Sequence, residues 1–146
     1  MQLTDVTLRE GGQMPGRSYT ADQKVEAGRH LDRLGVSVIQ AGFPVTGEVD
    51  KEATRRLATE ANAAIEGIAR AVPGDIDAVV EADADRLDVF APLSAGQLEH
   101  VMDTKYDEML EIIGDAIDHA RDYGLPMTLT LMDAFRTDLD RLVDGF

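Results

Sequence analysis

The sequence contains no cysteine, which excludes disulfides, thiolate zinc sites and cysteine nucleophiles. No apolar run reaches about 18 residues, so no transmembrane helix is predicted. The opening stretch MQLTDVTLRE also lacks the basic and apolar regions of a signal peptide. These absences favour a cytoplasmic location.

Basic residues are scarce. The 146 residues include 14 basic and 28 acidic side chains, giving a formal net charge of −14, and only three of the basic residues are lysines. Asp or Glu dilutes every basic stretch, which argues against nucleic acid and against anionic membranes, because both require clustered Lys and Arg. Excess carboxylates with few lysines are typical of adaptation to high salt, so a halophilic source is expected.

The overall composition is that of a folded domain. Hydrophobic residues make up 44% of the chain and charged residues 29%, which is enough apolar material for a core. No linker, repeat or low-complexity segment divides the sequence. We therefore expect one domain over residues 1–146.

Short β-favouring runs alternate with helical patterns along the whole chain. Strands are predicted over residues 3–8, 36–41, 64–72, 87–93 and 127–132, and helices begin near residues 20, 49, 73, 106 and 138. Thr20 and Gln23 form a capping-box pattern, while Gly35 and Gly124 are placed to end the first and the longest helix. Strands joined by helices indicate a parallel α/β sheet with right-handed crossovers.

Two architectures fit about five βα units. A flavodoxin-like doubly wound sheet suits a chain of this size, whereas a complete eight-stranded TIM barrel needs roughly 200–250 residues. Length alone therefore favours the open sheet.

The most unusual local feature is the segment from Asp5 to Gln13, DVTLREGGQ. It places Arg9 and Glu10 at the carboxyl end of the first predicted strand, the edge where α/β proteins bind ligands. Arg9 can hold an anionic oxygen, Glu10 can bind a hard divalent cation, and Gln13 can donate or accept a hydrogen bond beside them. An ordinary strand-end ion pair is the alternative interpretation.

This segment resembles the D-x-T-L-R-[DE]-G-x-Q signature of the homocitrate, 2-isopropylmalate and citramalate synthase family. The likeness continues through residues 39–44 (IQAGFP), 69–71 (ARA), 85–90 (DRLDVF) and 133–138 (DAFRTD), in order and over essentially the whole chain. The resemblance implies a TIM barrel with a divalent metal that condenses acetyl-CoA with a 2-oxo acid. It replaces the open sheet with a partial (β/α)8 barrel, so that residues 1–146 would form the N-terminal half to two-thirds of a pyruvate carboxyltransferase-like catalytic domain.

Carried over by position, the resemblance implies catalytic roles for Arg9 and Gln13. Arg9 would orient the 2-oxo acid and stabilise its developing oxyanion, and Gln13 would line the same pocket. Glu10 would bind Mg²⁺, Mn²⁺ or Zn²⁺. Arg70 and Arg136 would bind substrate carboxylates, unless they form structural ion pairs instead.

The chain also departs from the family pattern. Gln40, Asp88 and Met132 stand where family members usually carry Glu, His and Glu, and each would lie in or beside the pocket mouth. Met132 cannot act as a proton acceptor or an anion. These changes leave a shifted substrate and lost activity as alternatives.

A second departure concerns the metal, because the resemblance implies a His-x-His pair on a later strand and this sequence has none. Its histidines are His30, His100 and His119. We expect His30 and His119 to be surface or helix-packing residues, and His100 lies in a segment that resembles one reaching the active-site side. Glu10 alone would bind a metal weakly.

Three functional hypotheses follow. The first is a metal-dependent acyltransferase acting on acetyl-CoA and a 2-oxo acid in amino-acid biosynthesis. The second is a noncatalytic fragment or interaction module that closes its barrel as a homo-oligomer or with a complementing C-terminal half, because open sheet edges favour association. The third is a related metal-dependent lyase or aldolase.

Overall fold

The fold is a curled, five-stranded parallel sheet whose strands follow one another in chain order. The computed structural model describes residues 2–146. The strands are β1 (Thr4–Asp5), β2 (Val38–Gly42), β3 (Ala64–Arg70), β4 (Arg86–Pro92) and β5 (Met127–Met132), in the order β1-β2-β3-β4-β5. A doubly wound sheet would reverse its strand order at a switch point. The partial TIM barrel is therefore confirmed, and the open sheet favoured by length is wrong.

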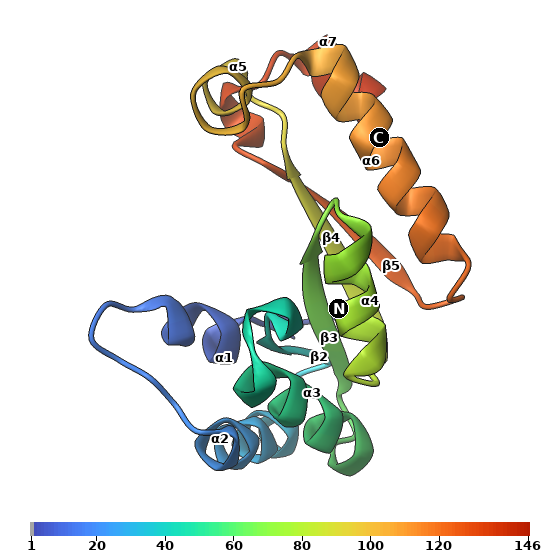
Figure 1. Ribbon diagram of the computed structural model, residues 1–146. Helices are drawn as coiled ribbons and strands as arrows, with labels where there is room; N and C mark the ends of the chain where they lie inside the picture. Colours follow the sequence, from blue (N-terminus) through green and yellow to red (C-terminus); the bar gives the residue numbers. More distant parts are fainter. Residues whose placement is uncertain (1) are drawn as a thin grey trace.

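Four long helices lie on the outer side of this curl (Figure 1). They are α2 (Ala21–Leu34), α3 (Glu48–Glu60), α4 (Pro73–Glu81) and α6 (Tyr106–Arg121). Shorter segments are α1 (Thr7–Glu10), η1 (Gly11–Gln13), η2 (Pro44–Thr46), α5 (Ala95–Gln97), η3 (Leu98–Met102), η4 (Ala134–Arg136) and α7 (Leu139–Asp144). In residues 2–146 no helix is both long and apolar enough to cross a membrane.

The predicted helix boundaries of α2 follow from its caps. Thr20 accepts a hydrogen bond from the backbone N–H of Gln23 at 3.2 Å, and the Gln23 side chain accepts one from the Thr20 N–H at 3.0 Å. Gly35 ends the helix in the left-handed region, with φ 88°. Both ends of α2 are therefore specified locally, as the sequence predicts.

The predicted first strand is wrong beyond Asp5. The Asp5 carboxylate accepts hydrogen bonds from the Thr7 backbone N–H at 2.9 Å and from the Thr7 hydroxyl at 3.1 Å. Such local side-chain bonds compete with the strand ladder and turn the chain. Arg9 and Glu10 therefore lie on the short helix α1 and not on a strand.

The two faces of the sheet differ in chemistry. Along β4, the alternate residues Leu87, Val89 and Ala91 are buried in the apolar core that α4 and α6 cover. The intervening residues Arg86 and Asp88 make polar contacts across the concave face with β3 and β5. Because side chains alternate along a strand, one strand contributes both to the core and to the concave face.

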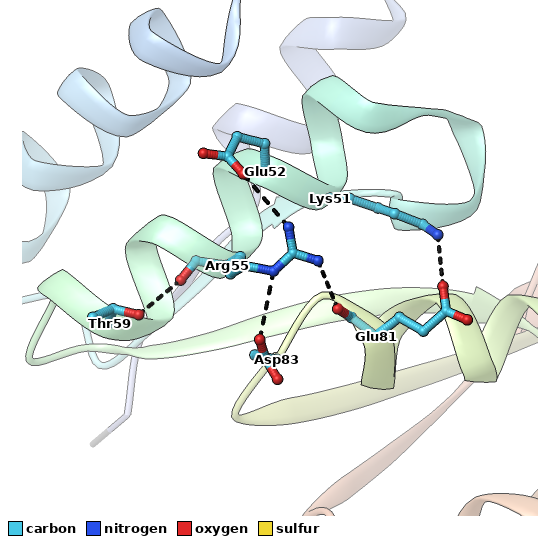
Figure 2. Close-up of polar contacts among 6 residues, drawn as sticks. All are labelled: Lys51, Glu52, Arg55, Thr59, Glu81 and Asp83. Atoms are coloured by element: carbon cyan, nitrogen blue, oxygen red, sulfur yellow. Dashed lines mark hydrogen bonds and ion pairs between the residues drawn. The ribbon is translucent and has the colours of Figure 1, made fainter.

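An ion-pair network joins the outer surfaces of α3 and α4 (Figure 2). Arg55 donates to the Glu81 backbone carbonyl at 2.8 Å and contacts the carboxylates of Glu52 and Asp83, each at 3.5 Å. Lys51 pairs with the Glu81 carboxylate at 2.8 Å. Exposed pairs of this kind contribute little individually, and these contacts lie on the side of the sheet opposite the concave face.

Candidate functional site

A cavity of about 320 Å³ lies where α1 and η1 face the strands β3 to β5. Its lining residues are Arg9, Glu10, Gln13, Phe43, Ile68, Asp88, Phe90, Thr130 and Met132. The structure therefore brings together the three motif residues proposed for catalysis and metal binding. It also places two of the family departures, Asp88 and Met132, in the same wall.

Arg9 is the cationic residue of this cavity. Its Nε donates a hydrogen bond to Gln40 Oε1 at 2.8 Å, and its guanidinium pairs with the Glu10 carboxylate. The Arg9 side chain is 19% exposed, whereas that of Glu10 is 53% exposed. Gln40 thus holds Arg9 without neutralising it, and the charge is balanced by a carboxylate that lies half in solvent.

Gln40 also connects Arg9 to the concave face of the sheet. Its amide Nε2 donates to Glu66 Oε2 at 2.9 Å and to Asp88 Oδ2 at 3.1 Å. Thr130 donates its hydroxyl to the other Asp88 oxygen at 2.8 Å. This chain of hydrogen bonds crosses β2, β3, β4 and β5, so the cavity wall is fixed by the sheet itself.

Asp88 differs electrostatically from its neighbour Glu66. Burial raises the pKa of Asp88, and the nearby Glu66 charge raises it further, while hydrogen bonds from Thr130 and Gln40 act in the opposite direction. Glu66 pairs with Arg86 at 3.3 Å, but in residues 2–146 no cation forms an ion pair with Asp88. Asp88 is therefore a buried carboxyl with two neutral donors and no direct counter-ion.

Arg70 lies at the end of β3 but outside this cavity. Its guanidinium binds Asp75 through two contacts, Nε–Oδ2 at 2.6 Å and Nη2–Oδ1 at 2.9 Å, and this pairing raises the pKa of Arg70. Arg70 lines a second, largely apolar cavity of about 390 Å³ that shares Phe90 and Met132 with the first. A substrate carboxylate at Arg70 would have to compete with the buried Asp75.

Arg136 lies further away, in η4, and lines neither of these two cavities. Its side chain is 81% exposed and pairs with Asp133 three residues earlier. A hydrogen bond from Ser94, and then the pairing with Arg136, lower the pKa of Asp133. The structure thus separates Arg136 from the motif residues.

The histidines are placed away from the cavity. His30 contacts Arg33 on α2, and His119 contacts Asp77 at 2.7 Å on the outer surface. His100 is exposed on η3. Throughout residues 2–146, no group of three His, Asp or Glu side chains is close enough to hold a metal ion.

Sequence reasoning did not identify Phe43, Ile68, Phe90 and Thr130 as cavity residues. Phe90 lies two residues after Asp88 on β4, and Thr130 on β5 lies directly across from Phe90. Alternate residues of a strand lie on one face of the sheet. Because Asp88 is expected at the pocket, this period predicts Phe90 on the same face.

Comparisons with known proteins agree with the motif. The model of the family described as HMGL-like matches residues 1–145. The chain is 42% identical to a probable 2-isopropylmalate synthase of Methanopyrus kandleri, over all of this chain and 30% of that protein. It is also 42% identical to homocitrate synthase AksA of the same organism, over 94% of this chain and 35% of that protein. The chain thus spans about a third of the length of these relatives.

A solved structure shows the same fold. The HMG-CoA lyase of Acinetobacter baumannii, determined with coenzyme A and 3-methylmalate, matches 98% of this chain and 50% of its own with a TM-score of 0.77. Sequence identity to it is 16%, so this likeness establishes the fold alone. Since the family model covers nearly every residue and the synthases align over the whole chain, the chain belongs to the HMGL-like family.

Proposed function

We propose that the chain forms part of an active site that condenses acetyl-CoA with a 2-oxo acid. The observation that carries this proposal is that Arg9, Glu10 and Gln13 line one cavity with the polar residues Asp88 and Thr130. The names of the relatives, 2-isopropylmalate synthase and homocitrate synthase, support the same chemistry. A cytoplasmic location and solubility in high salt remain part of the proposal.

Arg9 is suited to the charge that develops in this reaction. When a carbon nucleophile attacks the 2-oxo carbon, negative charge accumulates on the oxygen, and a pre-positioned donor stabilises it. Gln40 fixes the Nε side of Arg9, which leaves the Nη groups for Glu10 and for a bound anion. Gln13 can hydrogen-bond to the same ligand because it lines the same cavity.

The resemblance implies a divalent metal, Mg²⁺, Mn²⁺ or Zn²⁺, with Glu10 as a ligand. Such ions require several oxygen or nitrogen ligands, and Glu10 belongs to no three-residue ligand cluster within residues 2–146. The residues described therefore do not by themselves make a complete metal site. We keep Glu10 as the proposed ligand and assign no step of the reaction to the metal.

Arg70 and Arg136 remain proposed substrate-binding residues, on the condition that a substrate carboxylate replaces the carboxylate that each arginine now contacts. Arg70 must give up contacts to the buried Asp75, whereas Arg136 must give up only an exposed contact to Asp133. Exposed pairs are the weaker of the two kinds. A substrate carboxylate would therefore displace the Arg136 pair more readily.

Thiol release from acetyl-CoA, which follows when water hydrolyses the thioester of the condensed product, tests this proposal. We would measure it in molar KCl with Mg²⁺ or Mn²⁺ and with pyruvate, 2-oxoisovalerate or 2-oxoglutarate. The chain contributes no thiol background, because it has no cysteine. Release should require both the metal and one oxo acid, and should disappear in Glu10→Ala but not in Glu111→Ala, whose side chain is exposed on α6. Folded protein without release would contradict the proposal for this chain.

A second proposal is that the chain associates, as a homo-oligomer or with a complementing half-barrel. Within residues 2–146, β1 and β5 each pair with one strand only, and exposed apolar side chains follow β5: Phe135, Leu139, Val143 and Phe146. Unpaired edges and exposed apolar patches favour association. Light scattering after chromatography in high KCl should give a mass above that of one chain for a homo-oligomer, and a folded monomer would contradict self-association.

A further inference from the structure

Asp88 is the most deeply buried carboxylate in the wall of the candidate cavity. It is 7% exposed, and on β4 its two carboxylate oxygens accept hydrogen bonds from Gln40 and from Thr130. Glu10, the other carboxylate in this wall, is half in solvent and paired with Arg9. Asp88 is thus a titratable group at the cavity that the proposed oxyanion chemistry does not use.

The hydrogen bonds of Asp88 have fixed directions. Gln40 accepts from Arg9 through its carbonyl oxygen, so its amide N–H groups must point toward Glu66 and Asp88. Thr130 supplies the second donor from β5, which lies on the other side of β4 from the Gln40 strand β2. Asp88 is therefore oriented from both sides by neutral donors, which position the carboxyl without neutralising its charge.

Charged groups face Asp88 from three elements. Glu66 on β3 has the largest charge effect on the pKa of Asp88, and Glu66 is itself paired with Arg86 on β4 at 3.3 Å. Arg9 on α1 acts on Asp88 at longer range, and its own charge is shared with Glu10. Burial and the Glu66 charge together outweigh the hydrogen bonds from Thr130 and Gln40 and the charge of Arg9, so the pKa of Asp88 lies above its ordinary value. Such a shift moves a carboxyl toward the pH range in which it can both accept and donate a proton.

We propose that Asp88 is a catalytic residue that transfers a proton between a carbon and an oxygen of the bound substrates. This inference rests on the proposed function. The Asp88 carboxylate takes a proton from the methyl carbon of the acetyl group, and the electron pair of that C–H bond forms an enolate. The enolate carbon bonds to the 2-oxo carbon, whose C=O π pair moves onto oxygen. Asp88 then returns the proton to that oxygen, giving a hydroxyl group and regenerating the carboxylate.

Hydrogen exchange tests this step directly. The exchange of acetyl-CoA methyl hydrogens with D₂O, followed by proton NMR, should be at least about 100-fold slower in Asp88→Asn than in the unchanged chain. The matched control is Asp118→Asn, which changes an exposed carboxylate on α6 and should leave exchange unchanged. Circular dichroism establishes that each variant is folded. Undiminished exchange in folded Asp88→Asn would overturn the assignment.

The pH dependence of exchange separates a catalytic role from a structural one. Glu66→Gln removes a negative charge that raises the pKa of Asp88, so the midpoint of the profile should move to lower pH. Thr130→Val removes a hydrogen bond to the charged form, so the midpoint should move to higher pH. Loss of structure alone would lower the rate without moving the midpoint in opposite directions. Unmoved midpoints would overturn the assignment.

Failure of the proposed function can be distinguished from failure of the Asp88 assignment, because it abolishes exchange in the unchanged chain as well. If the unchanged chain exchanges no methyl hydrogens with any metal or oxo acid, the condensation proposal fails for this chain. Asp88 is then judged by carbon-13 NMR of its carboxyl group. A titration midpoint above that of an ordinary aspartate, lowered in Glu66→Gln, supports the environment inferred for Asp88, whereas an ordinary midpoint overturns the inference together with the condensation proposal.

Discussion

Asp50 is predicted to be essential for stability, because it neutralises a buried lysine. The Lys24 side chain on α2 is 5% exposed and pairs with Asp50 Oδ1, and its other hydrogen-bond partner is the Ala41 carbonyl at 3.4 Å. The second Asp50 oxygen accepts the Phe43 backbone N–H at 2.8 Å. Asp50→Ala would therefore leave a buried ammonium and a backbone donor without their carboxylate, next to a residue of the cavity wall.

The expected magnitude is large for a domain of this size. Removing one partner of a buried ion pair costs about 3–5 kcal/mol, because the remaining charge is desolvated without compensation. The total free energy of unfolding of a small domain is about 5–15 kcal/mol. Asp50→Ala should thus remove about a fifth or more of the stability, and the loosened loop should carry Phe43 out of the cavity wall.

Urea unfolding followed by far-UV circular dichroism measures this loss. The double variant Lys24→Met with Asp50→Leu removes both charges and should be more stable than Asp50→Ala. Gly42→Ala should reproduce part of the loss, because a Cβ there would lie 2.7 Å from the Asp50 carboxyl group. The control Asp118→Ala breaks an exposed pair and should cost less than about 1 kcal/mol.

Two results would refute this reasoning. A loss below about 1 kcal/mol in Asp50→Ala would mean that Lys24 reaches water or another anion once its partner is removed. A double variant no more stable than the single one would mean that packing, and not an unpaired charge, determines the loss.

Two further predictions concern Arg9 and Asp32. Arg9→Lys removes the Nε–H that donates to Gln40, so kcat/KM for thiol release should fall about 100-fold or more with stability little changed; an unchanged kcat/KM would contradict the role of Arg9. The pKa of Asp32 is lowered from 3.8, mainly because Asp32 accepts the Ala63 backbone N–H at 2.8 Å. Its stabilising contribution should therefore be present above pH 3.8 and lost as the pH falls through the lowered pKa, so Asp32→Ala should flatten the acid limb of a stability–pH curve.

The alternation of strands and helices could be predicted because it depends on local patterns. Apolar strand segments, the capping box of Thr20 and the left-handed Gly35 all specify structure within a few residues. Strand order could not be read from these patterns, and the resemblance supplied it. The error at the first strand was local too, because hydrogen bonds between Asp5 and Thr7 turn the chain. The spacing of apolar residues carries no information about such polar contacts.

The candidate site was predictable only in part, for a related reason. The motif residues Arg9, Glu10 and Gln13 are close in sequence, so any compact fold keeps them together. The partner of Arg70 could not be predicted, because whether an arginine faces a ligand or a carboxylate depends on tertiary packing. Asp75 is only five residues away, but it reaches Arg70 because α4 begins with a turn back over the end of β3.

The concave face explains how the site keeps its shape although the motif lies on short helices. Buried polar groups in a sheet interior are costly unless each is satisfied, and here the buried Gln40 donates to the buried Glu66 and Asp88, while the exposed Thr130 donates to Asp88. Because Arg9 joins this network through Gln40, its guanidinium is held by the sheet although its backbone lies on α1. Changes in the strand residues should therefore alter the orientation of Arg9 and the protonation of Asp88 together.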